Sequence, residues 1–201
     1  EVSIAEMAPQ VMMPIDYDLA QLVHQHINKK GVKIHLNNGV QSFVNHSDNN
    51  TDVILKDGTT IQSDIILLAI GIRPNGELAK DAGLEINQRG GIVVDKFLKT
   101  SDEAIYALGD VIEVKDFVHG NQTMVPLAGP ANKQGRICAN NIVLGNVQSY
   151  HGSINTAIVK VFDMTIATAG TAAKHLTTAH IEHKVSTTHN GSHASYYPGS
   201  K

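Results

Sequence analysis

Cysteine is scarce in this sequence, which contains only Cys138. A single thiol cannot form a disulfide within the chain, and it cannot supply a metal site built from several cysteines. Cys138 falls within a helix-like pattern, and no histidine or second thiol stands beside it. We therefore interpret it as a buried, unreactive side chain that fills the core.

Basic charge and long apolar runs are lacking as well. The net charge is -3, so the sequence has no cationic surplus of the kind that nucleic-acid-binding proteins carry. The longest apolar run, residues 65–70, is far shorter than the roughly 20 residues that cross a bilayer. No secretory signal is found at its start. We expect a protein that binds neither nucleic acid nor membrane and lies in the cytoplasm.

Histidine is plentiful, with eleven residues, but its spacing does not suit a metal site. His24 and His26 are two residues apart in a helical pattern, so they point to different faces. His189 and His193 have the spacing of helical ligands, but the Asn-Gly pair between them favours a turn. We expect no metal site.

The first 75 residues alternate between strand-like and helix-like patterns. A strand is expected at residues 1–6 and another at residues 32–36. Between them, five side chains recur at the three-and-four spacing of one helix face: Leu19, Leu22, Val23, His26 and Ile27. Strand, helix and strand in this order predict a parallel βαβ unit with a right-handed crossover.

More strands are expected after this unit. Residues 40–44 and 52–55 are β-like, and Asp57-Gly58 after the second run predicts a hairpin turn. Residues 61–70 are rich in Ile and Leu with little alternation, which is typical of a strand covered on both faces. The fold class expected from these patterns is α/β.

The middle of the chain forms a second block. Short strands are expected at residues 92–94 and 105–108. From Pro126 a helix is expected, and Gly145 ends it. Its inner face would consist of Ala131, Ile137, Cys138, Asn141 and Ile142.

A third block follows Gly152. Residues 154–166 alternate like a pair of strands, and residues 172–177 are consistent with a short helix. Residues 185–197 are expected to be extended.

Glu6 stands where an acidic residue has a defined role in dinucleotide-binding folds. At the carboxyl end of the second strand, such a residue accepts hydrogen bonds from the adenosine ribose hydroxyls. It also repels a 2′-phosphate, so Glu6 favours NADH over NADPH. The glycine fingerprint expected about 20 residues earlier is not in the chain, which we interpret as a fragment. A solvated carboxylate at a strand end is the alternative.

Residues 100–110 read TSDEAIYALGD and form the most informative segment. A buried strand at residues 105–108 would deliver Gly109, whose missing side chain lets a ligand approach the backbone. Asp110 follows, and its carboxylate can accept hydrogen bonds from ligand hydroxyls. The alternative is a Gly-Asp turn at a strand end, which many α/β proteins contain.

This segment resembles the T-S-x-x-x-I-Y-A-x-G-D segment of the FAD-dependent pyridine nucleotide-disulfide oxidoreductases. In that family the aspartate binds the ribityl chain of FAD. The resemblance therefore implies this role for Asp110, with Thr100 and Gly109 as further cofactor contacts. The family carries its reactive cysteine in an amino-terminal FAD region, so the resemblance also implies that this chain lacks the redox cysteine.

Two neighbouring motifs extend the resemblance. Residues 69–75, AIGIRPN, are similar to the A-x-G-x-R-P-N turn that closes the family's NADH domain, which implies Gly71 as a contact on the nicotinamide side. Residues 125–136 resemble the helix start that faces the flavin in the NADH oxidase, NADH peroxidase and coenzyme A-disulfide reductase branch. Leu127 and Ala128 are the implied flavin contacts, because the positive end of such a helix stabilises negative charge on reduced flavin. A plain loop and a surface helix start are the alternatives.

The last fifty residues resemble the start of the dimerisation domain in that branch. Residues 193–199, HASYYPG, are similar to a segment of coenzyme A-disulfide reductases and related persulfide reductases. In coenzyme A-disulfide reductases, tyrosines of this domain donate a hydrogen bond or proton near the reactive sulfur of the partner subunit. The resemblance implies Tyr196 and Tyr197 as catalytic candidates in a homodimer. Two tyrosines packed at a sheet edge are the alternative.

The resemblance implies three parts. Residues 1–75 would be a partial NAD(P)-binding Rossmann-like domain, residues 76–149 the carboxyl-terminal part of an FAD-binding domain, and residues 150–201 the start of an α+β dimerisation domain. The whole enzyme would transfer a hydride from NADH through FAD to a cysteine-centred disulfide or persulfide, with CoA disulfide as the expected substrate. An NADH oxidase or peroxidase and a non-catalytic flavin-binding or dimerising module are the alternatives. We expect the fragment alone to be inactive.

Overall fold

The computed structural model describes residues 1–47, 50–191 and 193–199. Its first block consists of strand β1 (Ser3–Ala5), helix α1 (Tyr17–Lys29) and strand β2 (Lys33–His35). The two strands pair in parallel, with Ile4 opposite Ile34. The parallel βαβ unit predicted from the sequence is therefore confirmed.

Helix α1 buries only part of the predicted face, because Val23 and Ile27 are buried as expected and other members of the face are not. Leu19 and Leu22, which were expected inside, are 44% and 46% exposed. His24 is buried instead, because the loop before α1 packs over it and the Val11 amide donates to His24 Nε2 at 3.1 Å. Burial lowers the pKa of His24, which keeps the ring neutral and able to accept this hydrogen bond.

A separate antiparallel sheet follows the βαβ unit. It consists of β3 (Val40–Asn45), β4 (Thr51–Leu55) and β5 (Thr60–Ser63), with β4 in the centre. The chain reverses between β4 and β5 at Asp57-Gly58. The two β-like runs and the hairpin turn predicted from the sequence are confirmed.

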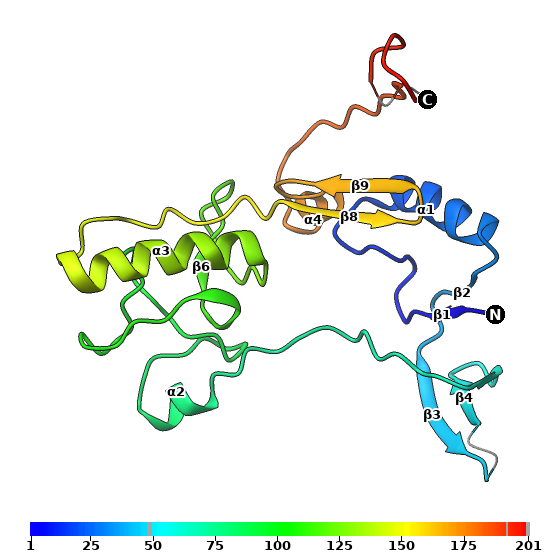
Figure 1. Cartoon of the computed structure of the whole chain (residues 1–201), viewed down its shortest axis with the longest axis horizontal. Helices are drawn as coiled ribbons and strands as arrows, with labels where there is room; N and C mark the ends of the chain where they lie inside the picture. Colours follow the sequence, from blue (N-terminus) through cyan, green and yellow to red (C-terminus); the bar gives the residue numbers. More distant parts are fainter. Residues whose placement is uncertain (48–49, 192, 200–201) are drawn as a thin grey trace.

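The strand predicted over residues 61–70 is wrong beyond Ser63. Residues 65–70 run between the two lobes of the molecule, and they pair with no strand in the described part of the chain (Figure 1). Ile65 and Leu67 are each 89% exposed, and Ile70 is 87% exposed. A strand is held by the hydrogen bonds of its ladder, so an apolar run without a neighbouring strand stays irregular.

The second block is built around one apolar core that includes Leu98, Ile112 and Ile137. Its elements are the short helix α2 (Glu77–Asp81), the 3-10 turn η1 (Gly109–Val111), the strand pair β6 (Val114–Lys115) and β7 (Gln122–Thr123), and helix α3 (Ala128–Leu144). Helix α3 covers this core and contacts η1 directly.

The strands predicted at residues 92–94 and 105–108 are wrong. Ile92 makes single β-bridges on both sides, and Tyr106 makes one to Lys99. Bridges of one residue cannot propagate into a ladder, so these segments stay irregular although their apolar side chains pack against the core.

Helix α3 matches its prediction closely. It runs to Leu144, and Gly145 ends it in the left-handed region at φ +81°. Cys138 is buried as expected, and burial raises the pKa of its thiol. Ile142 is 59% exposed, so the buried face of α3 is narrower than predicted.

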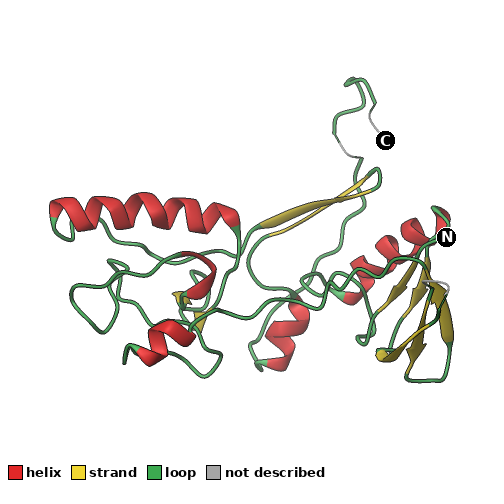
Figure 2. Ribbon diagram, turned by 60° about the horizontal axis from the view of Figure 1, so that its bottom comes forward, coloured by secondary structure: helices red, strands yellow, loops and turns green. Residues whose placement is uncertain are grey.

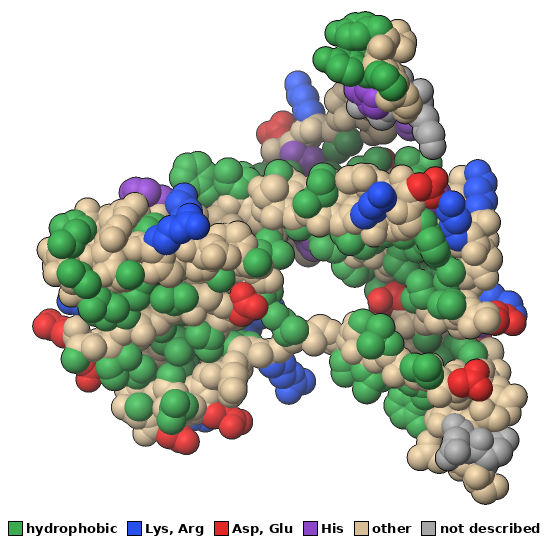
Figure 3. Space-filling view, viewed as in Figure 1, with side chains coloured by type: hydrophobic (Ala, Val, Ile, Leu, Met, Phe, Trp, Pro, Cys, Tyr) green, Lys and Arg blue, Asp and Glu red, His purple; other side chains and the backbone are tan. Residues whose placement is uncertain are grey.

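The third block begins with the predicted strand pair, β8 (Ala157–Val161) and β9 (Met164–Thr168), and the short helix α4 (Ala173–Thr178) follows. Figures 1 and 2 show one lobe around α3 and another around α1, with the β8–β9 hairpin reaching α1. The space-filling view shows an opening between the two lobes (Figure 3). None of the described helices has the length and apolar character needed to span a bilayer.

Candidate functional site

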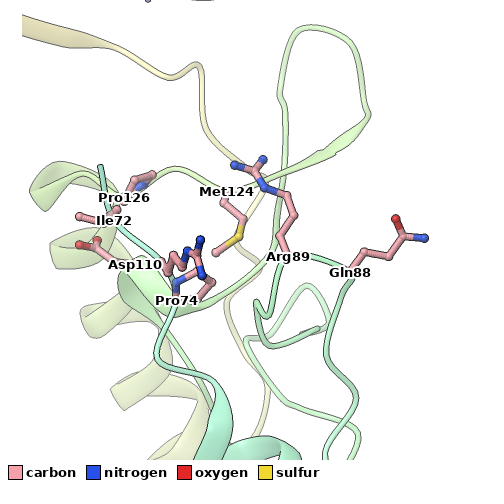
Figure 4. Close-up of a pocket in the computed structure, with 8 residues that line it drawn as sticks. Ile72, Pro74, Gln88, Arg89, Asp110, Met124 and Pro126 are labelled. Carbon is pink, nitrogen blue, oxygen red and sulfur yellow. The ribbon is translucent and has the colours of Figure 1, made fainter. Parts of the chain in front are cut away.

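A cavity of about 430 Å³ lies where two distant segments meet (Figure 4). The residues that line it are Ile72, Arg73, Pro74, Gln88, Arg89, Asp110, Met124 and Pro126. An adjoining hollow of about 440 Å³ is also lined by Ile72, Pro74 and Asp110. The 71–75 turn and the Gly-Asp turn, which the sequence singled out separately, therefore face one space.

Helix α3 holds the Gly109-Asp110 turn in place. The Gly109 amide donates to Gln134 Oε1 at 2.7 Å, and Gln134 is 1% exposed. Gly109 has φ +84°, a left-handed conformation that costs a residue with a Cβ about 1–2 kcal/mol. With its backbone held in this way, Asp110 stays exposed at the edge of the cavity, where a ligand hydroxyl can reach its carboxylate (Figure 4).

Sequence reasoning did not find Gln134. The available signal was a polar residue three positions before Ile137 on the inner face of a predicted helix. A buried polar side chain at such a position needs a hydrogen-bond partner, and here that partner is the backbone of the candidate site.

The cavity combines opposite charges with an apolar wall. Arg73 and Arg89 bring two cations to it, and Asp110 brings one anion. Figure 4 shows Met124 between Asp110 and Arg89. Arg89 and Met124 were not singled out by the sequence. The lining suits a ligand that carries hydroxyl groups and an apolar part together.

The start of α3 lies beside the cavity rather than in its wall. Leu127 is the N-cap residue of the helix and Ala128 is its first residue, but only their neighbour Pro126 lines the cavity. No side chain of the described residues caps this helix end. Its first-turn amides are therefore left to solvent or to a ligand, and the helix dipole makes this end positive.

Thr100 and Gly71 differ in how they are placed. The Thr100 hydroxyl donates to the carbonyls of Asp102 and Ile105 at 3.1 and 3.0 Å, so it closes its own loop and does not line the cavity. Gly71 is exposed and immediately precedes Ile72, which does line the cavity. Apart from its two chain neighbours, no atom of the described residues lies within 4 Å of where a Gly71 Cβ would stand, so its surroundings are open.

Glu6 lies in the other lobe, directly after β1. Its Oε1 accepts a hydrogen bond from the Ala8 amide at 2.8 Å, and its own amide donates to the His35 carbonyl at 2.9 Å. The carboxylate is therefore held at the carboxyl end of the parallel strand pair. This is the edge where nucleotide ligands bind in open α/β sheets.

Tyr196 and Tyr197 are not brought to the cavity. Their rings lie 4.9 Å apart, and the His193 ring meets Tyr197 edge-on at 5.8 Å. Tyr196 is 81% exposed, and the tail that carries both tyrosines extends away from the two lobes (Figure 1). Among the described residues, no cluster of His, Cys, Asp or Glu is arranged to hold a metal ion.

Known proteins of similar sequence and structure span much more than this chain. An NADH oxidase of Methanocaldococcus jannaschii is 33% identical over the whole chain, which covers 44% of that protein. The structure of reduced CoADR-RHD of Bacillus anthracis matches the whole chain at 45% identity and a TM-score of 0.93, and the chain covers 35% of it. An NAD-dependent persulfide reductase from A. fulgidus matches at 36% identity and a TM-score of 0.94, with 37% covered. The chain thus spans less than half the length of these proteins.

A family model confirms the assignment made from the sequence. The model described as pyridine nucleotide-disulphide oxidoreductase matches residues 1–135, which include both turns at the cavity and the start of α3. Enzymes of this family use FAD and a nicotinamide nucleotide, so the expected class of cofactor is confirmed at the level of the family. The chain belongs to the pyridine nucleotide-disulphide oxidoreductase family.

Proposed function

We propose that this chain forms part of a flavoprotein that transfers a hydride from NADH through FAD to a disulfide or persulfide of the coenzyme A type. One observation carries the proposal: Asp110, on a turn held by Gln134, faces the same cavity as the turn formed by Ile72 and Pro74. The two segments that the sequence assigned to the flavin and nicotinamide sides therefore meet at one place.

The residues at this cavity fit FAD. Asp110 would accept hydrogen bonds from ribityl hydroxyls, because its carboxylate is exposed and its backbone is fixed. The start of α3, at Leu127 and Ala128, would face the flavin ring with its positive dipole end. Gly71 would contact the cofactor through its open surroundings, and Thr100 would act indirectly, by shaping the loop before Asp110. FAD, when bound, supplies the two-electron chemistry.

NADH is the proposed reductant because of the charges around Glu6. Its carboxylate can accept from ribose hydroxyls and would repel a 2′-phosphate. The loop that follows, residues 7–16, contains no Lys, Arg or His. A 2′-phosphate would therefore meet the Glu6 carboxylate and no cation of this loop, which favours NADH over NADPH.

Similarity to a CoADR-RHD protein at 45% identity and to a persulfide reductase at 36% supports a CoA-type substrate. Tyr196 and Tyr197 would serve the partner's site in a homodimer, since they are exposed on a tail that leaves their own lobes. A phenol with a pKa near 10 stays protonated at neutral pH and can donate to a leaving thiolate. An NADH oxidase is the second candidate, favoured by the 33% identical relative.

The test is a steady-state comparison on the complete polypeptide that carries this chain. With NADH as the reductant, we expect turnover of oxidised CoA or CoA persulfide to exceed turnover of oxygen. Tyr197→Phe and Tyr196→Phe should lower turnover of the CoA substrate, whereas Tyr17→Phe, an exposed tyrosine of α1, should not. Faster turnover of oxygen would favour the NADH oxidase.

A non-catalytic module has its own signature. The protein would be yellow, and NADH would leave its flavin spectrum unchanged under anaerobic conditions. Bleaching of the flavin by NADH therefore supports the reductase and contradicts the module. The division at residues 1–75, 76–149 and 150–201 and the cytoplasmic location stay predictions.

A further inference from the structure

One carboxylate, that of Asp16, fastens helix α4 to the first block. Asp16 Oδ2 accepts a hydrogen bond from the Ala173 amide at 3.0 Å, and Asp16 Oδ1 accepts one from the Lys174 amide at 2.8 Å. The Lys174 ammonium donates to the Ile15 carbonyl at 2.6 Å. These groups are more than 150 residues apart in sequence. Asp16 and Lys174 thus clamp α4 to the start of α1.

The hairpin next to this clamp packs on the same helix. Val161, Met164 and Ile166 contact the apolar cluster of Ile15 and α1. At the hairpin turn, Asp163 lies 2.8 Å from the Lys30 ammonium, which lowers the pKa of Asp163 to about 2.

His26 adds a weaker contact at the same turn. Its Nε2 is 3.0 Å from Asp163 Oδ1, but it is not aligned for a hydrogen bond. The hairpin and α4 are therefore seated on α1 by apolar packing and by two carboxylates, Asp16 and Asp163.

The loop between β1 and α1 connects this seat to the proposed nucleotide site. It starts after Glu6 and ends at Asp16. Within it, the buried Gln10 side chain donates to the Ile15 carbonyl at 3.0 Å, so this one oxygen accepts from the loop and from Lys174 at the same time. A movement of the loop beside Glu6 would therefore displace the Ile15 carbonyl, to which Lys174 of α4 donates.

We propose that Asp16 is a positioning residue that couples NADH binding beside Glu6 to the docking of α4 and the hairpin on α1. The inference rests on the proposed function, because it takes Glu6 as a nucleotide contact. NADH that orders the loop would strengthen the Asp16 and Ile15 contacts with α4. Coupling of two equilibria is reciprocal: the factor by which NADH strengthens the docking of α4 is the factor by which docked α4 strengthens NADH binding. Loss of docking should therefore remove that factor from the NADH affinity.

The experiment uses the complete polypeptide that carries this chain, kept anaerobic. Hydrogen exchange of the amides at residues 173–176 is measured with and without NADH, and the dissociation constant of NADH is measured in parallel. Asp16→Ala removes both bonds to α4, and it removes no side-chain cap from α1, because Asp16 makes none. Asp18→Ala is the matched control, since Asp18 is an exposed aspartate in the first turn of α1 whose carboxylate accepts a hydrogen bond from the neighbouring Leu19 amide and makes none to α4.

We expect NADH to slow exchange at residues 173–176 in the wild type and in Asp18→Ala. In Asp16→Ala this protection should be lost, and the dissociation constant should rise about fivefold or more. Lys174→Met, which removes the contact with Ile15 and leaves Asp16 intact, should show a smaller change in the same direction and serves if Asp16→Ala does not fold.

Two results would overturn the coupling. Exchange at residues 173–176 could be the same with and without NADH, or Asp16→Ala could speed exchange while NADH affinity stays at the wild-type value. The second result would make Asp16 a purely structural contact. A wild-type protein that binds FAD but not NADH would overturn the proposed function, and the coupling with it.

Discussion

The two segments that lead to the candidate cavity are held very differently. The Gly109-Asp110 turn lies on a packed core, and the Gly109 amide is bonded to the buried Gln134 of α3. Residues 65–70, which lead to the Ile72 side of the cavity, are apolar, but they make no strand in the described part of the chain, and Leu67 is 89% exposed.

The difference shows what each kind of segment requires. A turn anchored by a side chain of a nearby helix needs only that helix, so the Gly109-Asp110 turn is held by residues of this chain. An apolar strand needs a neighbour on at least one edge and cover on its faces. Residues 65–70 have the apolar composition of a buried strand, but the described residues offer them neither a partner strand nor a covering layer.

A pair of leucine substitutions gives the largest expected contrast. Leu98→Ala removes a fully buried side chain from the core and should lower the free energy of unfolding by about 2–5 kcal/mol. Leu67→Ala should change it by less than about 0.5 kcal/mol, because that side chain is already in water. Urea unfolding of the 201-residue chain measures both. A large loss for Leu67→Ala would show that residues 65–70 are buried.

Gln134→Leu tests the anchor of the Asp110 turn. The substitution leaves the Gly109 amide without its partner, so the free energy of unfolding should fall by about 1–3 kcal/mol. Asn132→Leu is the control, because that exposed side-chain amide donates to the Ala128 carbonyl of its own helix and so does not hold the Asp110 turn. Thermal unfolding followed by circular dichroism measures both variants. Equal losses in the free energy of unfolding for the two variants would mean that the hydrogen bond from Gly109 to Gln134 does not stabilise the fold.

Two glycines of the same region should respond with opposite signs. Gly109→Ala should cost about 1–2 kcal/mol through its positive φ alone, since the nearest atom to an added Cβ is 3.9 Å away. Gly135→Ala, within α3, should stabilise by about 0.5–1 kcal/mol, because apart from the adjoining helix backbone no atom of the described residues lies within 4 Å of the added Cβ. Denaturant unfolding gives the two values. A neutral Gly109→Ala would show that the turn is not held in the left-handed region.

Local patterns predicted the elements whose contacts are local. Helix α3 with its stop at Gly145, the hairpin turn at Asp57-Gly58, and the β8–β9 pair all formed as expected, because each is specified by neighbouring residues. The strand predicted over residues 61–70 formed only as far as Ser63, because the rest has no partner strand in the described part of the chain.

Long-range polar contacts were beyond sequence reasoning for a related reason. Nothing in the local pattern of Asp16 or Gln134 indicates that one will bond α4 and the other Gly109. The family motifs singled out Asp110 and residues 69–75 as separate candidates. Only the fold shows that Asp110 and residues 72–74 line the same cavity.

Flavin retention by the complete polypeptide tests the central claim most directly. Asp110→Ala removes the carboxylate proposed to bind ribityl hydroxyls, and Asp102→Ala removes an exposed carboxylate earlier in the same segment. Hydrogen bonds to a charged group contribute about 1.5–3 kcal/mol, so FAD should bind at least about tenfold more weakly to Asp110→Ala, while Asp102→Ala keeps the wild-type affinity. Wild-type flavin affinity in Asp110→Ala would contradict the assignment of this turn to FAD.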